Sequence, residues 1–395
     1  MIHTEILIVG AGPGGCAAAI ALARAGVQTL LVDRQDFPRD KVCGDGLIPD
    51  ALNALETLGL LDTIGGEALS SDIIRVHAPN GNAIHVEGRF ACLPRRELDH
   101  RLLQAALEAG VGWMAPARLT DPLLEDGRVI GARLIGPDGR AVEVRADITL
   151  LATGAAVEPL RRFGVCQRQT PSAMAARAYY RVPPALATEY DGLSLSYTAA
   201  ICPGYGWIFP GPQGIYNLGV GIVYGQLHST VNLRQLWHLF LEEFAPARRL
   251  VQSSKLLGPL KGAPMRTGMT GARLWRPGLL VIGEAAGLTF PATGEGIGKA
   301  LESGLLAAEV LTESSHDGQS AGARYEQRLR ERFAARYRSY QRAERFLAYP
   351  WIINLLTWRA NRGQYIRREM GNLLTETCPP GAVFSPLGIA RTLLF

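Results

Sequence analysis

The chain has 395 residues, of which 47% are hydrophobic and 19% charged, so it can bury a large core and is not an intrinsically disordered chain. Its net charge of +5 lies in one segment, since eight arginines and three glutamates fall between Arg324 and Arg345. The rest of the chain is close to neutral, which argues against a nucleic-acid-binding groove. The six cysteines are widely spaced and form no C-x-x-C pair, so neither a metal site nor a disulfide framework is expected.

No apolar run approaches the roughly 20 residues that cross a bilayer, and the first strand begins too close to Met1 for a signal peptide. With its cysteines reduced, the protein is expected to be cytoplasmic. The aromatic and apolar segment 346–356 follows the arginine-rich stretch. It indicates either a peripheral membrane contact or a helix packed on the body of the protein. The sequence predicts no oligomeric state.

A strand, a glycine loop, a helix and a second strand are predicted at the N-terminus. The apolar run 6–9 leads into a G-x-G-x-x-G loop, a helix follows over 16–25, and a strand over 29–32 ends at Asp33. This context predicts that a dinucleotide binds, with helix N–H groups facing its phosphates and the Asp33 carboxylate accepting from a ribose hydroxyl. The motif does not distinguish FAD from NAD. The residues assigned to this site are Gly10, Gly12, Pro13, Gly14, Gly15, Asp33 and the adjacent Arg34.

A second cofactor motif is predicted near residue 283. The apolar strand 278–282 is followed by Gly283 and Glu284, and a loop containing Pro291, Gly294 and Gly296 opens a helix at Ile297. A carboxylate after a strand, followed by a helix N-terminus, suits a cofactor with a polyhydroxyl chain and an electron-accepting ring. The alternative is that Glu284 only caps the following turn.

Together these segments resemble the flavoproteins built like p-hydroxybenzoate hydroxylase and, more narrowly, the geranylgeranyl reductase family. The resemblance extends over essentially the whole chain. It rests on PRDKVCGDGL at 38–47, Arg95 with Leu98 and Asp99, LLATG at 150–154, PGYGWIFP at 203–210, GEGI at 294–297 and a closing segment from Pro379 to Leu394. Glu284 departs from the family pattern, which usually has Asp at this position.

The resemblance implies an α/β fold, α+β overall, with a Rossmann-like FAD-binding domain, an inserted mainly antiparallel β-sheet domain for the substrate and a helical C-terminal segment. The FAD-binding domain is expected over 1–68, 93–154 and 272–311, and the substrate domain over 71–91 and 155–271. The helical region is expected over 312–395. A hairpin over 129–135 and 141–144, turned by Pro-Asp-Gly at 137–139, is assigned to the FAD-binding domain.

The resemblance also implies which residues contact FAD. Gly14, Gly15 and Asp33 would hold the ADP half, with Leu119 near the adenine and Arg95 near the pyrophosphate. Cys43, Gly44 and Gly46 would lie beside the flavin ring, and Gly296 and Ile297 at its pyrimidine edge. Gly154, Gly283, Glu284, Pro291 and Gly294 complete the expected set.

Two features are candidates for catalysis. Cys43, between Lys41 and two glycines, is either a thiol of lowered pKa or a small buried hydrophobe. The alternating run 205–210 places Tyr205, Trp207 and Phe209 on one face, where they form either a cavity wall or ordinary core. Family resemblance implies that this run lines the substrate cavity. Cys43, Tyr205 or a bound water is expected to supply a proton.

The resemblance implies reduction of carbon–carbon double bonds in an isoprenoid or related hydrophobic lipid, by hydride transfer from reduced FAD. Only one strand-flanked G-x-G-x-x-G is present, so electrons are expected from NAD(P)H binding transiently or from a ferredoxin-like protein. The alternative is a monooxygenase acting on an aromatic or specialised metabolite, since the fold alone does not decide.

Two other functions have less support. Halogenases that resemble this family need a lysine in the middle of the flavin domain and a W-x-W-x-I-P motif. The chain has no lysine between Lys41 and Lys255, and position 205 is Tyr. A non-catalytic flavin- or lipid-binding role has no support, because the flavin-facing motifs are intact apart from Glu284.

Overall fold

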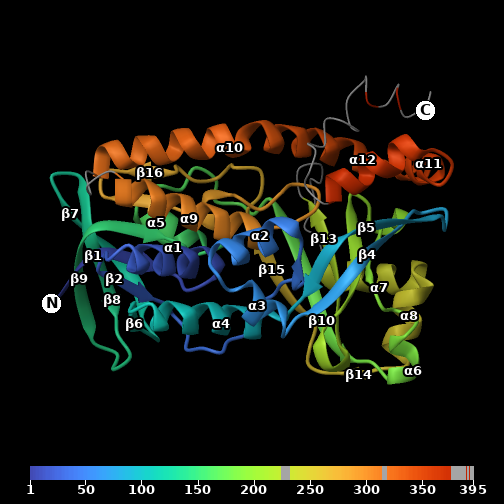
Figure 1. Ribbon diagram of the computed structural model, residues 1–395, viewed down its shortest axis with the longest axis horizontal. Helices are drawn as coiled ribbons and strands as arrows, with labels where there is room; N and C mark the ends of the chain where they lie inside the picture. Colours follow the sequence, from blue (N-terminus) through green and yellow to red (C-terminus); the bar gives the residue numbers. More distant parts are fainter. Residues whose placement is uncertain (224–231, 314–317, 375–387, 389–390, 392–395) are drawn as a thin grey trace.

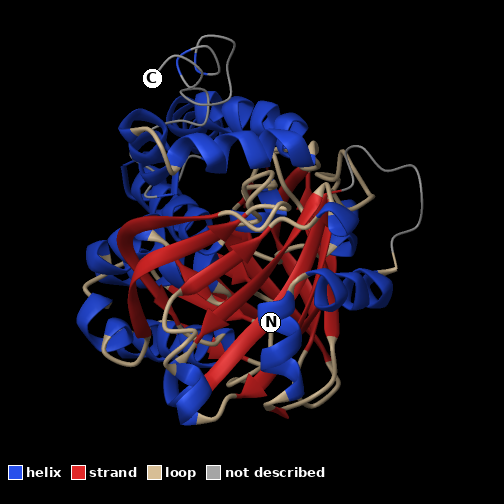
Figure 2. Ribbon diagram, turned by 90° about the vertical axis from the view of Figure 1, so that its right-hand side faces the viewer, coloured by secondary structure: helices blue, strands red, loops and turns tan. Residues whose placement is uncertain are grey.

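In the computed structural model, two β-sheets lie side by side and a long C-terminal helix runs along both of them (Figure 1). Helices flank the strands when the molecule is turned by 90° (Figure 2). The structure describes residues 1–223, 232–313, 318–374, 388 and 391. Most of the closing segment from Pro379 to Leu394 is therefore outside the described residues.

The first sheet contains a run of parallel strands in the order β17, β9, β1, β2 and β6. An antiparallel hairpin extends it beside β9, and one short strand adds an edge beside β17. Its strands are β1 (Ile2–Val9), β2 (Thr29–Val32), β6 (Gly112–Met114), β7 (Arg118–Glu125), β8 (Arg128–Ile135), β9 (Ala141–Leu151), β16 (Trp275–Arg276) and β17 (Leu279–Val281). The carboxyl ends of β1, β2, β9 and β17 consequently meet at one edge, where ligands of parallel sheets bind.

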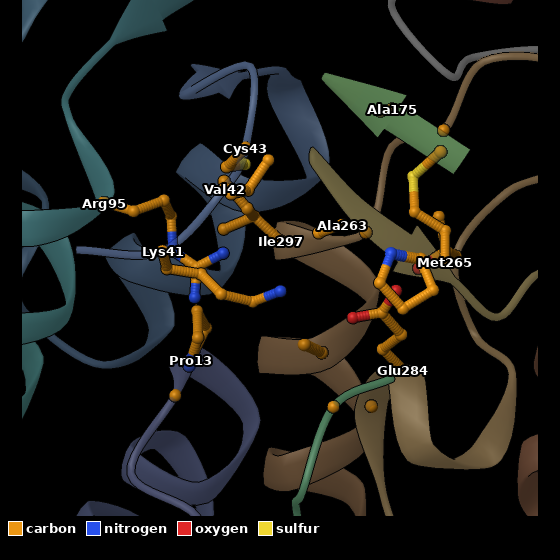
Figure 3. Close-up of a pocket in the computed structure, with 18 of the residues that line it drawn as sticks. Pro13, Lys41, Val42, Cys43, Arg95, Ala175, Ala263, Met265, Glu284 and Ile297 are labelled. Carbon is orange, nitrogen blue, oxygen red and sulfur yellow. The ribbon is translucent and has the colours of Figure 1, made fainter. Parts of the chain in front are cut away.

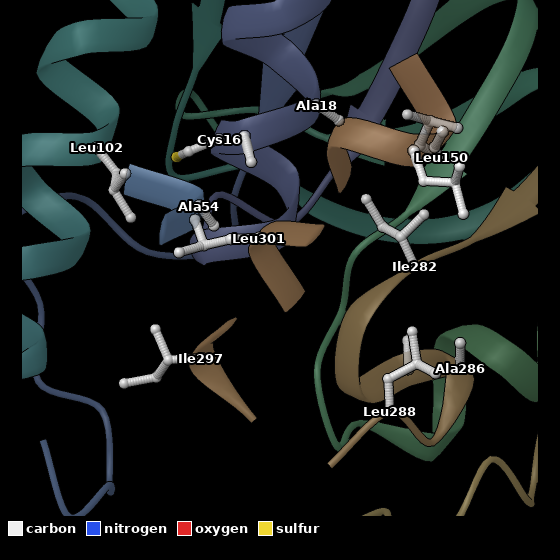
Figure 4. Packing of buried hydrophobic residues seen from close by; sticks show 14 of the residues in the cluster. Cys16, Ala18, Ala54, Leu102, Leu150, Ile282, Ala286, Leu288, Ile297 and Leu301 are labelled. Carbon is white, nitrogen blue, oxygen red and sulfur yellow. The ribbon is translucent and has the colours of Figure 1, made fainter. Parts of the chain in front are cut away.

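Helix α1 (Pro13–Arg24) follows β1 and packs between α4 (Arg95–Glu108) and α9 (Ile297–Glu313). The contact between α1 and α9 depends on glycine, because a Cβ on Gly304 would lie only 2.3 Å from the carbonyl oxygen of Gly14. Cys16 and Ala18 of α1 and Leu301 of α9 belong to the same buried core (Figure 4). Close packing of small residues thus holds the two helices whose N-termini face the edge of the sheet. The remaining helices around this core are α2 (Pro49–Thr57), α3 (Leu61–Gly65) and α5 (Val157–Arg162).

The second sheet is mostly antiparallel, in the order β14, β10, β13, β12, β11, β4, β5 and β3, with β15 also beside β10. Its strands are β3 (Gly46–Leu47), β4 (Leu69–His77), β5 (Ala83–Cys92), β10 (Ala173–Arg181), β11 (Leu193–Ser196), β12 (Gly204–Pro210), β13 (Ile215–Val223), β14 (Lys255–Leu256) and β15 (Lys261–Met265). Helix α7 (Leu233–Glu243) packs on β10 and β13 and is followed by α8 (Ala245–Gln252). A short helix, α6 (Pro184–Ala187), completes this side of the sheet.

The C-terminal helices connect the two sheets. Helix α10 (Gly318–Leu347) donates from Tyr325 to the carbonyl of Val281 in the first sheet, and farther along from Gln341 to the carbonyl of Gly268. Helix α11 (Pro350–Ala360) contacts the turn between β4 and β5, where the N–H of Asn80 donates to Oδ1 of Asn354. Its C-cap residue Asn361 donates to the carbonyl of Ala83, the first residue of β5. Helix α12 (Gln364–Leu374) packs against β5. Among the described residues, no helix is both long and apolar enough to span a bilayer.

The predicted fold class is confirmed. The strands expected over 6–9, 29–32 and 278–282 and the helix expected over 16–25 form as β1, β2, β17 and α1, with ends shifted by a few residues. The hairpin turned at 137–139 forms between β8 and β9, although β9 continues to Leu151 because its second half is buried in the parallel sheet. Strand β3 begins at Gly46 and pairs with β5, so the loop before it lies between the two sheets.

Candidate functional site

A cavity of about 500 Å³ lies where the two sheets meet. Its lining combines the loops at the carboxyl ends of β1, β2, β9 and β17 with side chains from β10, β12 and β13. Figure 3 shows Pro13, Lys41 and Arg95 on one side of this space, Glu284 and Met265 on the other, and Cys43 and Ile297 between them. The segments singled out in the sequence are therefore brought together around one cavity.

The loop between β1 and α1 has the backbone that its glycines predict. Gly10 adopts φ +110°, and a Cβ there would lie 2.4 Å from the carbonyl oxygen of Ala152. A Cβ on Gly15 would lie 1.9 Å from the oxygen of Gly10, so Gly15 serves packing and does not line the cavity. Pro13 begins α1, which has no acidic residue in its first turn and no side-chain cap. This helix terminus therefore presents its dipole and N–H groups to an anion.

Asp33 lies at the end of β2 and is 8% exposed. Its Oδ2 accepts from the N–H of Ala11 at 2.9 Å and its Oδ1 from the N–H of Gln35 at 3.0 Å. The carboxylate is thus fixed in place by main-chain donors and retains lone pairs for a ligand hydroxyl. Arg34 and Leu119 line the same cavity.

Two guanidinium groups face the glycine loop. Arg95 donates from Nε and Nη2 to the two oxygens of Asp99 at 2.7 and 2.8 Å, and Arg39 contacts Asp99 at 3.1 Å. A Cβ on Gly12 would lie 3.9 Å from a terminal nitrogen of each arginine. Burial alone would lower the pKa of Arg95, but the Asp99 carboxylate raises it, so Arg95 keeps its charge. Arg39 also lies 4.0 Å from the Asp33 carboxylate. The two guanidiniums place charged N–H donors beside the glycine loop, as the binding of a pyrophosphate requires.

Asp45 is a site residue that the sequence analysis missed. It is 1% exposed and lines the cavity in a left-handed conformation with φ 67°. Its Oδ2 accepts from the hydroxyl of Tyr179 at 2.5 Å and from Nδ2 of Asn217 at 2.7 Å, and its Oδ1 accepts from the N–H of Arg95 at 3.2 Å. Burial raises the pKa of Asp45 to about 6, although the hydrogen bonds from Tyr179 and Asn217 act in the opposite direction.

The interpretation of Cys43 as a thiol of lowered pKa is wrong. Burial raises the pKa of this thiol, and the opposing effect of the nearby Arg95 charge is smaller. Because a free cysteine already titrates above neutral pH, Cys43 remains protonated in the folded protein. The side chain still lines the cavity, so it is a neutral thiol that a ligand can reach.

The aromatic side chains of β12 both pack and line the cavity. The Tyr205 and Trp207 ring centroids lie 6.0 Å apart and those of Trp207 and Phe209 6.4 Å apart. Tyr197 extends this wall, with its ring centroid 5.7 Å from that of Tyr205. A Cβ on Gly46 would lie 3.1 Å from the Phe209 ring, so glycine allows the loop to approach the wall. Burial raises the pKa of Tyr205, whose hydroxyl donates to the carbonyl of Thr293.

On the opposite side, Glu284 lines the cavity and its Oε1 accepts from the N–H of Arg266 at 3.3 Å. A Cβ on Gly154 would lie 3.6 Å from Glu284 Oε2. The other expected residues on this side, Gly283, Gly294, Gly296 and Ile297, also line the cavity. Pro291 does not, and lies on a neighbouring cleft.

Comparison with known proteins places the chain in a family. Residues 3–174 match the family model described as an FAD binding domain. The chain is 31% identical to a menaquinone reductase from Mycolicibacterium smegmatis, over 95% of this chain and 93% of that protein. It is 30% identical to digeranylgeranylglycerophospholipid reductase 1 from Methanopyrus kandleri, over 83% of this chain and 86% of that protein. The chain belongs to the geranylgeranyl reductase family of FAD-dependent oxidoreductases.

Solved structures share this fold. A geranylgeranyl bacteriochlorophyll reductase-like protein from Thermoplasma acidophilum has a TM-score of 0.79 at 22% identity, covering 100% of this chain and 96% of that one. A flavin-dependent brominase has a TM-score of 0.78 at 20% identity, covering 99% and 98%. At such identities the likeness concerns the fold alone.

The residues that line the cavity between the two sheets, the reductase cavity, fit FAD. The buried hydroxyl oxygens of Thr153 and Thr293 both belong to cavity-lining residues, and neither has a hydrogen-bond partner among the described residues. Buried polar groups normally have hydrogen-bond partners, so these two hydroxyls indicate that a polar ligand binds in the cavity. The helix terminus at Pro13, the arginines beside Gly12 and the fixed Asp33 carboxylate supply the groups that a dinucleotide needs.

Proposed function

We propose that this enzyme reduces carbon–carbon double bonds of an isoprenoid chain. The observation that carries the proposal is the apolar extension of the cavity beyond the cofactor loops. Its lining there comes mainly from the second sheet: Ile74, Ala173, Ala175, Leu193, Leu195, Tyr197, Tyr205, Trp207, Phe209, Ile222, Val223, Ala263 and Met265. A long surface without charged groups favours a hydrocarbon ligand, because polar atoms would lose their hydration there without gaining partners.

We assign the ADP half of FAD to the loop before α1, with Gly14 at the pyrophosphate, Asp33 at the ribose and Leu119 near the adenine. Arg95 would neutralise the pyrophosphate together with Arg39, which the sequence did not single out. Gly15 would act through packing. The flavin ring would lie between Cys43, Gly44 and Gly46 on one side and Gly296 and Ile297 on the other. These glycines lack a Cβ, so they allow main-chain groups to approach a flat ring.

Bound FAD, once reduced, supplies a hydride donor; the protein must hold the alkene, exclude water and supply one proton. Cys43 is our preferred proton donor, because its neutral thiol lines the cavity while the Tyr205 hydroxyl is already engaged by the carbonyl of Thr293. The charge left on sulfur after proton transfer would be stabilised by the nearby Arg95 guanidinium. The wall formed by Trp207 and Phe209 would hold the alkene flat against the face of the flavin ring.

The electron donor is proposed to come from outside the chain. The sequence holds a single strand-flanked G-x-G-x-x-G, and that loop is assigned to FAD. Either NAD(P)H binds transiently at the cavity or a ferredoxin-like protein delivers electrons. Rates of flavin reduction with NADH, NADPH and reduced ferredoxin, measured by bleaching of the bound flavin, distinguish these donors.

The test of the reaction is mass spectrometry of isoprenoid substrates after anaerobic incubation with dithionite-reduced enzyme. Geranylgeranyl diphosphate, geranylgeraniol and menaquinone are offered in parallel. A mass gain in steps of two hydrogens supports the proposal. No gain with any isoprenoid, combined with product formation only when O₂ is consumed, would instead establish the monooxygenase alternative.

We also propose that α11 contacts a membrane surface. Tyr349, Trp351 and Trp358 are 53, 63 and 40% exposed, and the guanidiniums of Arg359 and Arg362 lie over the Trp358 ring. Aromatic rings beside cations are typical of helices that lie in an anionic lipid interface.

Flotation with vesicles of 30% anionic lipid tests this contact. Trp351→Ala should weaken binding severalfold, whereas Leu124→Ala should not, since Leu124 is 52% exposed on β7 near the far end of the molecule (Figure 1). Equal flotation of both variants and the wild type would contradict the membrane proposal.

A further inference from the structure

A second cleft adjoins the reductase cavity. The two share the lining residues Val223 and Thr267, so the apolar end of the cavity meets the cleft at this point. The cleft is polar and lies between the segment 168–172, the loop 267–270 and the face of α10 that carries Gln341, Glu344 and Arg345. A hydrocarbon chain in the cavity could therefore continue into a polar head group here.

Arginines at this cleft have unused hydrogen-bonding capacity. Arg168 donates from Nη2 to Ser172 Oγ at 2.6 Å and to the carbonyl of Thr267 at 3.4 Å, while its buried Nε has no partner among the described residues. Arg266 lies directly behind it, is 1% exposed, and donates to the main-chain carbonyls of Arg168 and Gly271. Its Nε is likewise unpartnered within the described part of the chain.

The charge of this region is unbalanced. Arg168 and Arg345 line the cleft with Arg266 directly behind, and the described lining holds one carboxyl, that of Glu344, against these three guanidiniums. Burial and the charge of Arg266 lower the pKa of Arg168, and burial raises the pKa of Glu344, the one carboxyl in the described lining. Glu344 offsets only part of the positive charge of Arg168, Arg266 and Arg345, so the cleft keeps an excess of positive charge that favours an arriving anion.

We propose that this cleft binds the phosphate or diphosphate head group of the isoprenoid substrate, with Arg168 and Arg345 as its direct ligands. The inference rests on the proposed function and narrows its substrate class to phosphorylated isoprenoids. Guanidinium groups match phosphate oxygens in charge and geometry. An uncharged quinone head would offer these arginines no anionic oxygen. The chain would pass Val223 and continue into the cavity toward Trp207.

The first test compares two substrates that differ only in the head group. Geranylgeranyl diphosphate and geranylgeraniol are given to the dithionite-reduced holoenzyme, and to Arg168→Gln, Arg345→Gln and Arg342→Gln. Arg342 is an exposed arginine of the same helix that does not line the cleft. Loss of one charge-assisted hydrogen bond should raise KM for the diphosphate about tenfold and leave KM for the alcohol unchanged. Arg342→Gln should match the wild type.

A change of opposite sign provides a check that impaired folding cannot imitate. Glu344→Gln removes the carboxyl from the cleft and should lower KM for the diphosphate severalfold, again without affecting the alcohol. Binding of both compounds to the oxidised holoenzyme, measured by calorimetry, should follow the same pattern without turnover. Digeranylgeranylglyceryl phosphate in detergent, compared with the free diphosphate, identifies which source of phosphate is preferred.

Equal effects of Arg345→Gln on the diphosphate and the alcohol would overturn the head-group proposal, as would effects seen only when NADPH replaces dithionite. The latter result would assign the cleft to the nicotinamide donor. If no isoprenoid is reduced at all, the proposed function fails. The calorimetric comparison then still decides whether the cleft recognises the diphosphate.

Discussion

The side-chain amide of Asn217 donates over 2.7 Å to the main-chain carbonyl of Cys43. The same Nδ2 reaches Asp45 at 2.7 Å, and the amide oxygen accepts from Nε1 of Trp207 at 2.9 Å. One residue of β13 therefore fastens the loop beside the proposed flavin position to the aromatic wall of the substrate cavity. Tyr179, on β10, adds a further bond to Asp45. The second sheet thus positions the loop that follows β2 of the first sheet.

Removing this amide should loosen the loop. Asn217→Ala removes the partner of the Cys43 carbonyl and of the Trp207 N–H and one of the bonds to the Asp45 carboxyl, at a cost of about 3 kcal/mol in the free energy of unfolding. FAD affinity should fall at the same time, as measured by titrating the apoprotein with FAD.

The matched control is Asn232→Ala. Asn232 caps α7 through the N–H groups of Arg234 and Gln235 and does not line the cavity. Its loss should cost about 1 kcal/mol and leave FAD affinity unchanged. A similar fall in FAD affinity for both variants would mean that the Asn217 effect is general destabilisation.

Asp45 should make stability depend on pH below neutrality. The pKa of Asp45 is raised from 3.8 to about 6 by burial, so between about pH 4 and 6 the folded state keeps a proton that the unfolded state has lost. The free energy of unfolding should therefore decrease as pH rises through this window, by up to about 3 kcal/mol.

Asp45→Asn tests this pH dependence, because asparagine also tolerates the left-handed backbone at this position. Urea unfolding between pH 4.5 and 7.5 measures how the free energy of unfolding depends on pH. In the variant, the decrease that Asp45 causes should be absent. Asp138→Asn, at an exposed turn, should keep the wild-type slope. Parallel curves for Asp45→Asn and the wild type would refute the assignment.

The sequence predicted the parts of the site that depend on local pattern. The Gly10–Gly15 loop needs a tight turn directly after an apolar strand, and Asp33 follows the next strand, so both can be recognised within about 30 residues. The class of fold was implied by the family resemblance that these motifs carry. Glu284 was recognised in the same way.

The connections between the sheets could not be predicted. Asn217 and Asp45 are 172 residues apart and Tyr179 and Asp45 are 134 apart, and no periodicity links them. The sequence left two interpretations of Cys43 open, and burial rules out the thiol of lowered pKa, because the effect of a nearby cation depends on how much water remains. Arg168 lies in a segment without regular secondary structure. It lines the same cleft as Arg345 only because α10 packs beside that segment.

Cys43→Ser should slow alkene reduction while FAD stays bound. A serine hydroxyl is a far weaker acid than a thiol, and loss of a general acid commonly costs about a hundredfold in rate. Single-turnover oxidation of the reduced flavin by substrate measures the step directly. Cys202→Ser is the control, since that thiol donates to the carbonyl of Ala348 and does not line the cavity. Wild-type turnover in Cys43→Ser would mean that Tyr205 or a bound water is the proton donor.

Trp207→Ala should separate the two half-reactions. Trp207 is 5% exposed and lines the cavity, so truncation should cost about 3 kcal/mol in stability and also remove the surface against which the alkene lies. With rates normalised to bound flavin, reduction of the flavin should change little, whereas its oxidation by the isoprenoid should slow at least tenfold. Trp237→Ala, in the separate core behind the second sheet, should reduce stability without this selectivity. Equal slowing of both half-reactions in Trp207→Ala would mean that this ring only supports the fold.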